Sequence, residues 1–175
     1  MHWCFFDDIL VYSKTWESHL VHLGQVLQLL LTDQWHIKLS KCAFAQQQIA
    51  YLSHVICSKG VSTDPAKVEA VKSWPVPTNC KELRGFLGLA GYYRKFVKHF
   101  GMIAKPLTEL LKKGVLFVWT QDHSVAFDTL KQSLCSAPVL ALPNFEVPFA
   151  IECDASGYGI GAVLLQEGHP LAFCQ

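Results

Sequence analysis

Two adjacent carboxylates, Asp7 and Asp8, are the residues whose type and spacing most clearly suggest chemistry. Two anions held side by side repel each other, and burial raises their pKa values unless a cation lies between them. Magnesium suits that position because it binds carboxylate oxygens together with substrate phosphates. A polar loop between two strands would account for the same pair, so the doublet alone leaves both explanations open.

The residues around the two acids predict a β-hairpin that carries them at its tip. Apolar runs of strand-forming composition occupy residues 3–6 and 9–12. A two-residue hairpin turn favours Asn-Gly or Asp-Gly, because its backbone needs positive φ. Asp-Asp is therefore a poor choice on turn chemistry, and the acids need another reason to be there.

The rest of the chain predicts a mixed α+β fold made of short elements. Capping residues indicate helices that begin after Thr15, Asp64, Asn79 and Thr120. The first of these should end near Asp33. A further short helix is expected at 107–111, and strands are expected at 35–39, 49–56, 115–119 and 149–154, the last continuing into a hairpin through 162–165.

The helix after Asn79 contains Gly85, Gly88 and Gly91 at intervals of three residues. Each glycine costs a helix about 1 kcal/mol relative to alanine, so helix propensity does not explain the stripe. A stripe without side chains allows close approach to the backbone, either by a neighbouring helix or by the minor groove of a duplex. Aromatic and basic residues follow directly and suit stacking and phosphate contact: Tyr92, Tyr93, Arg94, Lys95, Lys98 and His99.

Charge is unevenly distributed along the 175 residues, although the net charge is only +1. Residues 59–113 carry eleven Lys and Arg against four Asp and Glu, a net charge of +7, between flanking segments of −1 and −5. This indicates a polyanionic partner that one module contacts. Seven scattered cysteines without C-x-x-C spacing favour reduced, mostly buried thiols. No apolar run approaches the roughly 20 residues of a membrane span, so we expect an intracellular, soluble protein, cytoplasmic or nuclear.

A series of motifs resembles the reverse transcriptase and ribonuclease H segment of the Pol polyprotein of gypsy-class long-terminal-repeat retrotransposons. The motifs are, in order, Phe5-Phe6-Asp7-Asp8 with Ile9-Leu10-Val11-Tyr12-Ser13, Lys41-Cys42-x-Phe44, Tyr51-Leu52-Ser53-His54-Val55-Ile56, Asp64-Pro65-x-Lys67, Trp74-Pro75-x-Pro77, the run from Leu83 to Phe96, and Asp154-Ala155-Ser156-x-x-Gly159-x-Gly161-Ala162-Val163-Leu164-x-Gln166. Their shared order makes the resemblance specific, and it covers essentially the whole chain.

The resemblance implies an α+β fold with four parts. Residues 1–58 would be the C-terminal part of a reverse transcriptase palm and residues 59–105 a helical thumb. Residues 106–147 would be the connection region, and residues 148–175 the first β-hairpin strands of a ribonuclease H-like domain. The implied chemistry is nucleotidyl transfer by an RNA-directed DNA polymerase and RNA hydrolysis by an endonuclease, within a multifunctional enzyme.

The resemblance also assigns site residues. Asp7, Asp8 and Asp154 would be catalytic and would bind Mg²⁺, with Mn²⁺ as the alternative. The implied contacts with an RNA–DNA or DNA primer–template come from Tyr51, Leu52, Ser53, His54, Gly85, Gly88, Tyr92, Arg94, Lys95 and Lys98. Ser53 replaces a glycine that is usual in the family and could crowd the primer.

Family metal sites use carboxylates beyond those in this sequence, so both sites are expected to be incomplete here. Deoxynucleoside triphosphates would be substrates of the intact parent enzyme, whose other palm, fingers and nuclease segments would lie elsewhere in the polyprotein. The chain alone is therefore expected to be inactive. The alternative is a non-catalytic retroelement remnant that binds primer–template through its basic thumb.

Overall fold

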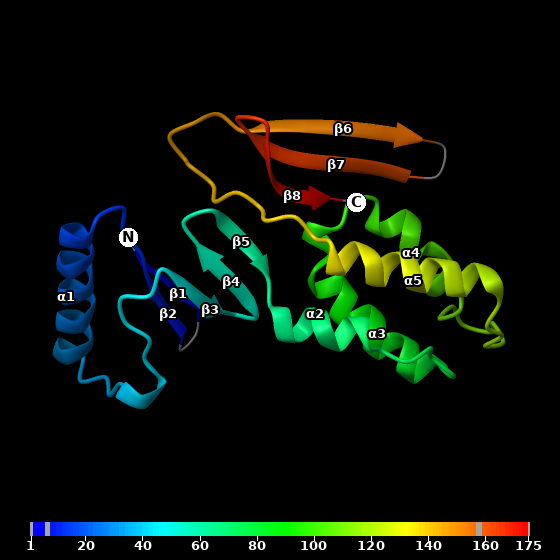
Figure 1. The fold of residues 1–175 in the computed structure, drawn as a ribbon, viewed down its shortest axis with the longest axis horizontal. Coiled ribbons are helices and arrows are strands. Elements are labelled where there is room, and N and C mark those ends of the chain that lie inside the picture. The colour runs from blue at the N-terminus through cyan, green and yellow to red at the C-terminus, as the bar shows by residue number, and fades with distance from the viewer. Residues whose placement is uncertain (1, 6–7, 157–158, 175) are drawn as a thin grey trace. The chain divides into compact units, whose positions relative to one another are not determined.

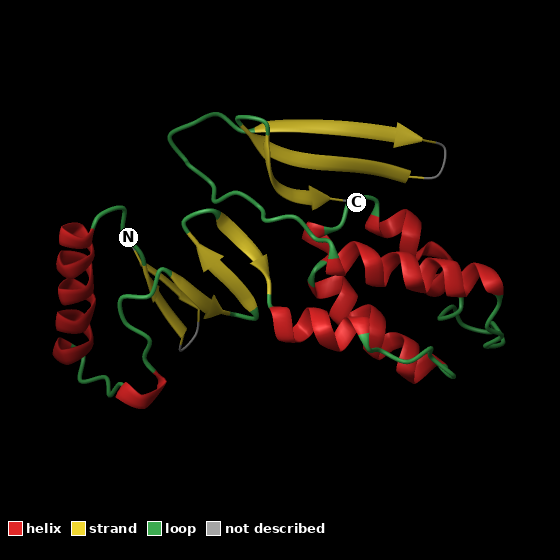
Figure 2. Cartoon of the chain, viewed as in Figure 1, coloured by secondary structure: helices red, strands yellow, loops and turns green. Residues whose placement is uncertain are grey.

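The computed structural model of the chain describes residues 2–5, 8–156 and 159–174. It combines helices with antiparallel strands (Figures 1 and 2), which confirms the α+β class. The chain divides into two compact units, Met1–Tyr51 and Leu52–Gln175.

The first unit begins with the predicted hairpin. Strand β1 (His2–Phe5) pairs antiparallel with β2 (Asp8–Val11), and Phe5 lies opposite Asp8. The hairpin prediction is therefore confirmed, and Asp8 is the first residue of the second strand. Asp7 lies outside the described residues.

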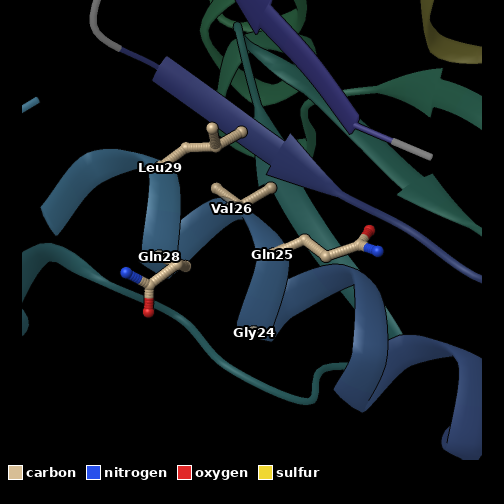
Figure 3. A pocket seen from close by; sticks show the side chains of 5 residues that line it. All are labelled: Gly24, Gln25, Val26, Gln28 and Leu29. Atoms are coloured by element: carbon tan, nitrogen blue, oxygen red, sulfur yellow. The ribbon is translucent and has the colours of Figure 1, made fainter. Parts of the chain in front are cut away.

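Helix α1 (Trp16–Thr32) begins and ends where the sequence predicts. The Thr15 side chain accepts a hydrogen bond from the Ser18 amide, and the Ser18 hydroxyl accepts one from the Thr15 amide, which forms a capping box. Val26 is its buried residue. Figure 3 shows Val26 among the residues lining a shallow, mostly apolar hollow of about 560 Å³, together with Gly24, Gln25, Gln28 and Leu29. None of these residues is charged, so the hollow offers no acid–base chemistry.

The strand predicted at 35–39 is wrong. This segment is irregular and leads into the short 3₁₀ helix η1 (Leu39–Lys41), and among the described residues it pairs with no strand. Its apolar composition suggested burial, yet Trp35 and Leu39 are each 70% exposed. The first unit ends with β3 (Gln48–Tyr51).

The strand predicted at 49–56 is also wrong as a single element. The chain turns at Leu52-Ser53 and continues as β4 (His54–Cys57), which pairs antiparallel with β5 (Gly60–Thr63). Gly60 has φ +137°, and a Cβ added there would lie 2.0 Å from the Leu140 carbonyl oxygen. Only glycine fits this close approach.

Helices form the core of the second unit. Helix α2 (Pro65–Lys72) starts at its predicted cap, because the Asp64 carboxylate accepts from the Ala66 amide. It is followed by α3 (Cys80–Tyr92), η2 (Arg94–Phe96), α4 (Phe100–Glu109) and α5 (Gln121–Cys135). The buried cluster that joins them includes Val71, Leu83, Phe86, Ala90, Tyr93, Phe96, Leu107, Phe127, Leu130 and Leu134. The helix predicted after Thr120 is confirmed as α5, and its buried face is formed by Ala126, Phe127, Leu130 and Leu134.

Two predictions in this unit are wrong. The helix predicted at 107–111 begins at Phe100 and contains Pro106 in its interior, because burial of Ala104 and Leu107 favours one continuous helix. The strand predicted at 115–119 is irregular, and Phe117 and Trp119 pack from it against the helical core. Their aromatic composition serves packing rather than strand pairing.

The unit ends in an antiparallel sheet of order β6-β7-β8 (Figure 1), formed by Ala150–Ser156, Gly159–Gln166 and His169–Cys174. The hairpin predicted from residue 149 is confirmed. The buried Gln166 amide group accepts from the Asn144 amide at 2.8 Å and donates to the carbonyl oxygens of Asn144 and Val147 at 2.7 and 2.8 Å. This residue therefore fixes the loop that leads into β6.

The side chains of six cysteines are described, and all six are free thiols: Cys42, Cys57, Cys80, Cys135, Cys153 and Cys174. The first three cysteines are half-buried and the other three are exposed. The prediction of mostly buried thiols is therefore wrong for these six residues. Within the described ranges, no helix has the length and apolar character needed to cross a membrane.

Candidate nucleic-acid interface

Helix α3 buries one face and leaves the other open. The Asn79 side chain caps its first turn by accepting from the amides of Lys81 and Glu82. The Glu82 carboxylate accepts from the amide and hydroxyl of Thr78, and these bonds lower its pKa. Leu83, Phe86 and Ala90 are fully buried. The glycines at 85 and 88 lie with Arg84 on the exposed side.

The glycine stripe faces open space over most of its length. A Cβ added at Gly85 would meet the Trp74 ring at 3.6 Å, an ordinary van der Waals distance. At Gly88 and Gly91, no atom of the described structure outside the helix's own turns comes within 4 Å of an added Cβ. A neighbouring helix therefore does not explain these two glycines within the described chain.

The basic residues after the stripe differ in their access to solvent. Arg94 and Lys98 are exposed, and Tyr92 is 49% exposed. Lys95 is half-buried, with its ammonium group 5.2 Å from the centre of the Phe96 ring, and burial lowers its pKa. Arg94 and Lys98 are thus the charged groups best placed for phosphate contact.

The Leu52-Ser53 turn contacts the end of α3 directly. Both residues have positive φ, +47° and +55°. The Tyr92 hydroxyl donates to the Leu52 carbonyl oxygen and the Tyr93 hydroxyl to that of Ser53, each at 2.6 Å. Residues predicted as the primer-supporting segment and the thumb segment are therefore brought together. The positive φ of Ser53 gives a backbone reason for the glycine that is usual at this position.

His54 fills the space between this turn and the aromatic residues. Its Nδ1 lies 2.6 Å from the Leu52 carbonyl oxygen, and its ring is 5.3 to 5.7 Å from those of Tyr92, Tyr93 and Phe96. Its Nε2 is buried and has no hydrogen-bond partner among the described residues. Burial lowers the pKa of His54; the hydrogen bond to the Leu52 carbonyl oxygen acts in the opposite direction, and the nearby Lys95 charge lowers it further. At neutral pH the imidazole is therefore uncharged, and Nδ1–H is the donor to the Leu52 carbonyl oxygen.

The sequence indicated Tyr93 as part of an aromatic and basic run but gave no sign of its hydrogen-bonding role. Its side chain is 1% exposed, and burial followed by the charge of Asp64 raises its pKa to about 12. The phenol therefore stays protonated and remains a donor. The nearest signal in the sequence is the doublet Tyr92-Tyr93 at the end of a helix. Consecutive side chains there point in different directions, so one ring can be buried while the other stays half-exposed.

Two of the three predicted catalytic carboxylates, Asp8 and Asp154, lie within the described residues, one in each unit of the chain, and Asp7 lies outside them. Asp8 is exposed, and its carbonyl oxygen accepts a hydrogen bond from the Tyr51 hydroxyl at 3.1 Å. Asp154 is exposed on β6 opposite Gly161. Within 2–5, 8–156 and 159–174, no three His, Cys, Asp or Glu side chains lie together to hold a metal ion.

Solved structures that match this fold include reverse transcriptases. A foamy viral protease-reverse transcriptase in complex with double-stranded DNA matches 99% of this chain and 31% of its own length, at a TM-score of 0.90 and 26% identity. A second structure, of a foamy viral protease-reverse transcriptase in complex with an RNA/DNA hybrid, matches 98% of this chain and 24% of its own length, at a TM-score of 0.88 and 26% sequence identity. The fold is therefore that of the reverse transcriptase class.

Sequence relatives define the family. The model of the RNase H-like domain found in reverse transcriptase matches residues 119–174. An uncharacterised mitochondrial protein of Arabidopsis thaliana is 55% identical over 130 residues, which cover 73% of this chain and 82% of that protein. The Pol polyprotein of transposon 297 of Drosophila melanogaster is 40% identical over 171 residues, 97% of this chain but 16% of the polyprotein. The Tf2-3 polyprotein of Schizosaccharomyces pombe is 39% identical over 164 residues, which cover 94% of this chain and 12% of the polyprotein.

The chain belongs to the retrotransposon Pol family, in its reverse transcriptase and RNase H-like region. It spans less than a fifth of the length of the transposon polyproteins that it matches.

Proposed function

We propose that this chain is the part of a reverse transcriptase that binds the primer–template duplex, with the exposed face of α3 and the residues after it as the contact surface. Gly85 and Gly88 would admit the duplex to the helix backbone, and Tyr92, Arg94, Lys95 and Lys98 would contact sugars and phosphates. Residues 1–58 would be palm, 59–105 thumb, 106–147 connection and 148–175 the start of the ribonuclease H-like domain.

The open glycine stripe is the observation that carries this proposal. Glycines inside a helix cost stability, and a Cβ added at Gly88 or Gly91 would meet no described atom within 4 Å outside the helix's own turns, so packing of another described element against that position does not offset the cost. The segment from 59 to 113 has a net charge of +7, and Arg94 and Lys98 are exposed directly after the stripe. A smooth, cationic surface suits a polyanion that approaches the backbone.

The relatives support this proposal. The foamy viral proteins of the same fold are described in complex with double-stranded DNA and with an RNA/DNA hybrid. A duplex is therefore a better partner for α3 than a protein helix, which would need an apolar surface in place of exposed Arg84 and Arg94.

For the chemistry, we propose that Asp7 and Asp8 bind Mg²⁺ or Mn²⁺ for nucleotidyl transfer from deoxynucleoside triphosphates, and Asp154 for RNA hydrolysis, only where further carboxylates complete the sites. Two-metal catalysis holds both the attacking and the leaving oxygen. Among the described residues, neither Asp8 nor Asp154 belongs to a group of three His, Cys, Asp or Glu side chains that could hold a metal ion. Duplex binding without catalysis is therefore the activity we propose for the chain by itself.

Binding can be tested by fluorescence anisotropy with a labelled DNA primer–template over a range of salt concentrations. We expect affinity to fall steeply with salt, and Arg94→Ala and Lys98→Ala each to weaken binding and lower the salt slope by about 1. Lys112→Ala is the matched control, because Lys112 forms an exposed ion pair with Glu109 at 2.6 Å outside the stripe. Salt-independent binding, or equal losses in all three variants, would refute the proposed surface.

Catalysis can be tested separately by primer extension with Mg²⁺. We expect no extension by the chain alone. Extension that disappears on Asp8→Asn would show that the chain is itself a polymerase and would overturn the non-catalytic part of the proposal.

A further inference from the structure

The Leu52-Ser53 turn is a strained element built from unsuitable residues. A hairpin turn with positive φ at both central positions normally uses Asn-Gly or similar sequences. Leu52 and Ser53 both have side chains and both have positive φ, +47° and +55°. Such strain persists where the surrounding structure overdetermines the conformation, and it concentrates at ligand-holding sites.

Three donors fix the two carbonyl groups of this turn. The Leu52 oxygen lies 2.6 Å from the Tyr92 hydroxyl and 2.6 Å from His54 Nδ1, so both of its lone pairs are used. The Ser53 oxygen accepts from the Tyr93 hydroxyl at 2.6 Å. Two of the donors thus come from residues about forty positions further along the chain, at the end of α3.

We propose that Tyr92 and Tyr93 are positioning residues that lock this turn in place through their hydroxyl groups. The lock makes the turn a rigid support for the end of a nucleic-acid strand, and it couples the turn to the helix that binds the duplex. This inference rests on the proposed function.

Packing alone does not account for both hydroxyl groups. Phenylalanine would fill the space of the buried Tyr93 ring, and Tyr92 is 49% exposed, so its ring adds little to the core. Both phenols nevertheless direct their hydroxyls to main-chain oxygens of consecutive residues. Fixing the backbone of the turn is the effect that the two bonds have in common.

The experiment compares two DNA probes of equal length, one with a recessed 3′ end and one blunt. We expect Tyr93→Phe to weaken binding of the recessed probe about fivefold, the equivalent of one hydrogen bond, and to leave blunt-duplex binding unchanged. Tyr92→Phe changes a residue of the proposed contact surface, so we expect it to weaken binding of both probes, and of the recessed probe about fivefold more. Ser53→Gly should rescue Tyr93→Phe, because glycine adopts positive φ without the lock. Thr129→Val is the control, since it removes one hydroxyl that donates to the Val125 carbonyl oxygen within α5.

Amide hydrogen exchange of residues 52–54 in the free protein tests the lock without DNA. We expect exchange to accelerate about fivefold in Tyr93→Phe and to slow again with Ser53→Gly. Unchanged exchange, or equal losses on both probes, would overturn the inference. Accelerated exchange in a protein that binds neither probe would leave the lock standing and refute the proposed function.

Discussion

Gly88→Ala should stabilise the fold and weaken duplex binding, and this opposition is a strong test of the proposed surface. Gly88 lies inside α3, and an added Cβ meets no described atom within 4 Å apart from the helix's own turns. Alanine should therefore contribute its full advantage over glycine in a helix, about 1 kcal/mol. For a chain of this length, we expect a rise of about 2–4 °C in the melting temperature.

The same methyl group would lie where the duplex approaches the backbone. Inserting a methyl group into a close-packed contact costs about 1–3 kcal/mol, so we expect about a tenfold loss of affinity for the primer–template in the anisotropy assay. Gly24→Ala is the matched control. Gly24 is also helical, in α1, and an added Cβ there also meets no described atom within 4 Å. We expect the same gain in stability from this control and no change in binding.

The two outcomes that would contradict this reasoning are distinct. A Gly88→Ala variant that loses stability would show that something covers the stripe in the folded protein. A variant that gains stability and keeps its full affinity would show that the duplex does not approach Gly88, and the glycine stripe would no longer support the proposed function.

Three further predictions concern stability. Gly60→Ala should lower the free energy of unfolding, measured in urea, by about 3–4 kcal/mol, because its Cβ would overlap the Leu140 oxygen and break the two 2.8 Å hydrogen bonds between Val61 and Leu140. Gly114→Ala is the control: at φ +84°, with no described atom within 4 Å of the added Cβ, it should lose only about 1–2 kcal/mol. Equal losses in the two variants would refute the clash at Gly60. Gln166→Leu should cost about 2–4 kcal/mol in the same assay, since buried main-chain groups lose their partners, and a loss below 1 kcal/mol would contradict that role. Burial lowers the pKa of His54 below its usual 6.5, so as the pH falls the unfolded chain takes up the proton before the folded chain does, and the free energy of unfolding should fall below pH 6.5. His54→Gln should flatten this pH dependence. An unchanged pH profile in that variant would show that His54 does not cause it.

The sequence predicts helix starts well because their causes are local. A cap at Asp64 needs only an amide two residues later, and the box at Thr15 needs only Ser18. The apolar face of α5 is likewise readable from its period of 3.6 residues. Such features depend on neighbours within one or two turns, so the sequence alone contains the information.

Strands are harder to predict, because each needs a partner that the local sequence does not name. The segments 35–39 and 115–119 have strand composition but pair with no strand among the described residues. In the second segment, Phe117 and Trp119 pack on the helical core instead. β-propensity reports that a side chain fits a half-buried surface, which an irregular segment can also provide.

The turn at Leu52-Ser53 could not be predicted for a related reason. Neither residue signals a turn, and the apolar run around them favours one continuous strand. The conformation depends on hydroxyl groups of Tyr92 and Tyr93, about forty residues away. The primer-supporting role proposed for this segment rests on the family resemblance, while the buried donor Tyr93 became evident only in the fold.

Two local costs lie in the same part of the second unit, and this coincidence argues for an external partner. The three glycines lower the propensity of α3 by about 3 kcal/mol, and the two positive φ values at Leu52 and Ser53 cost about 1–2 kcal/mol each. The hydrogen bonds from Tyr92 and Tyr93 offset the strain in the turn, but no described atom lies within 4 Å of a Cβ added at Gly88 or Gly91 outside the helix's own turns, so the cost of these two glycines is not offset there. The Leu52-Ser53 turn is hydrogen-bonded to the end of the same helix. A ligand that binds the glycine stripe would therefore find this turn already fixed in its strained conformation. Selection for fold stability alone would remove both costs, whereas selection for binding a duplex would keep them together.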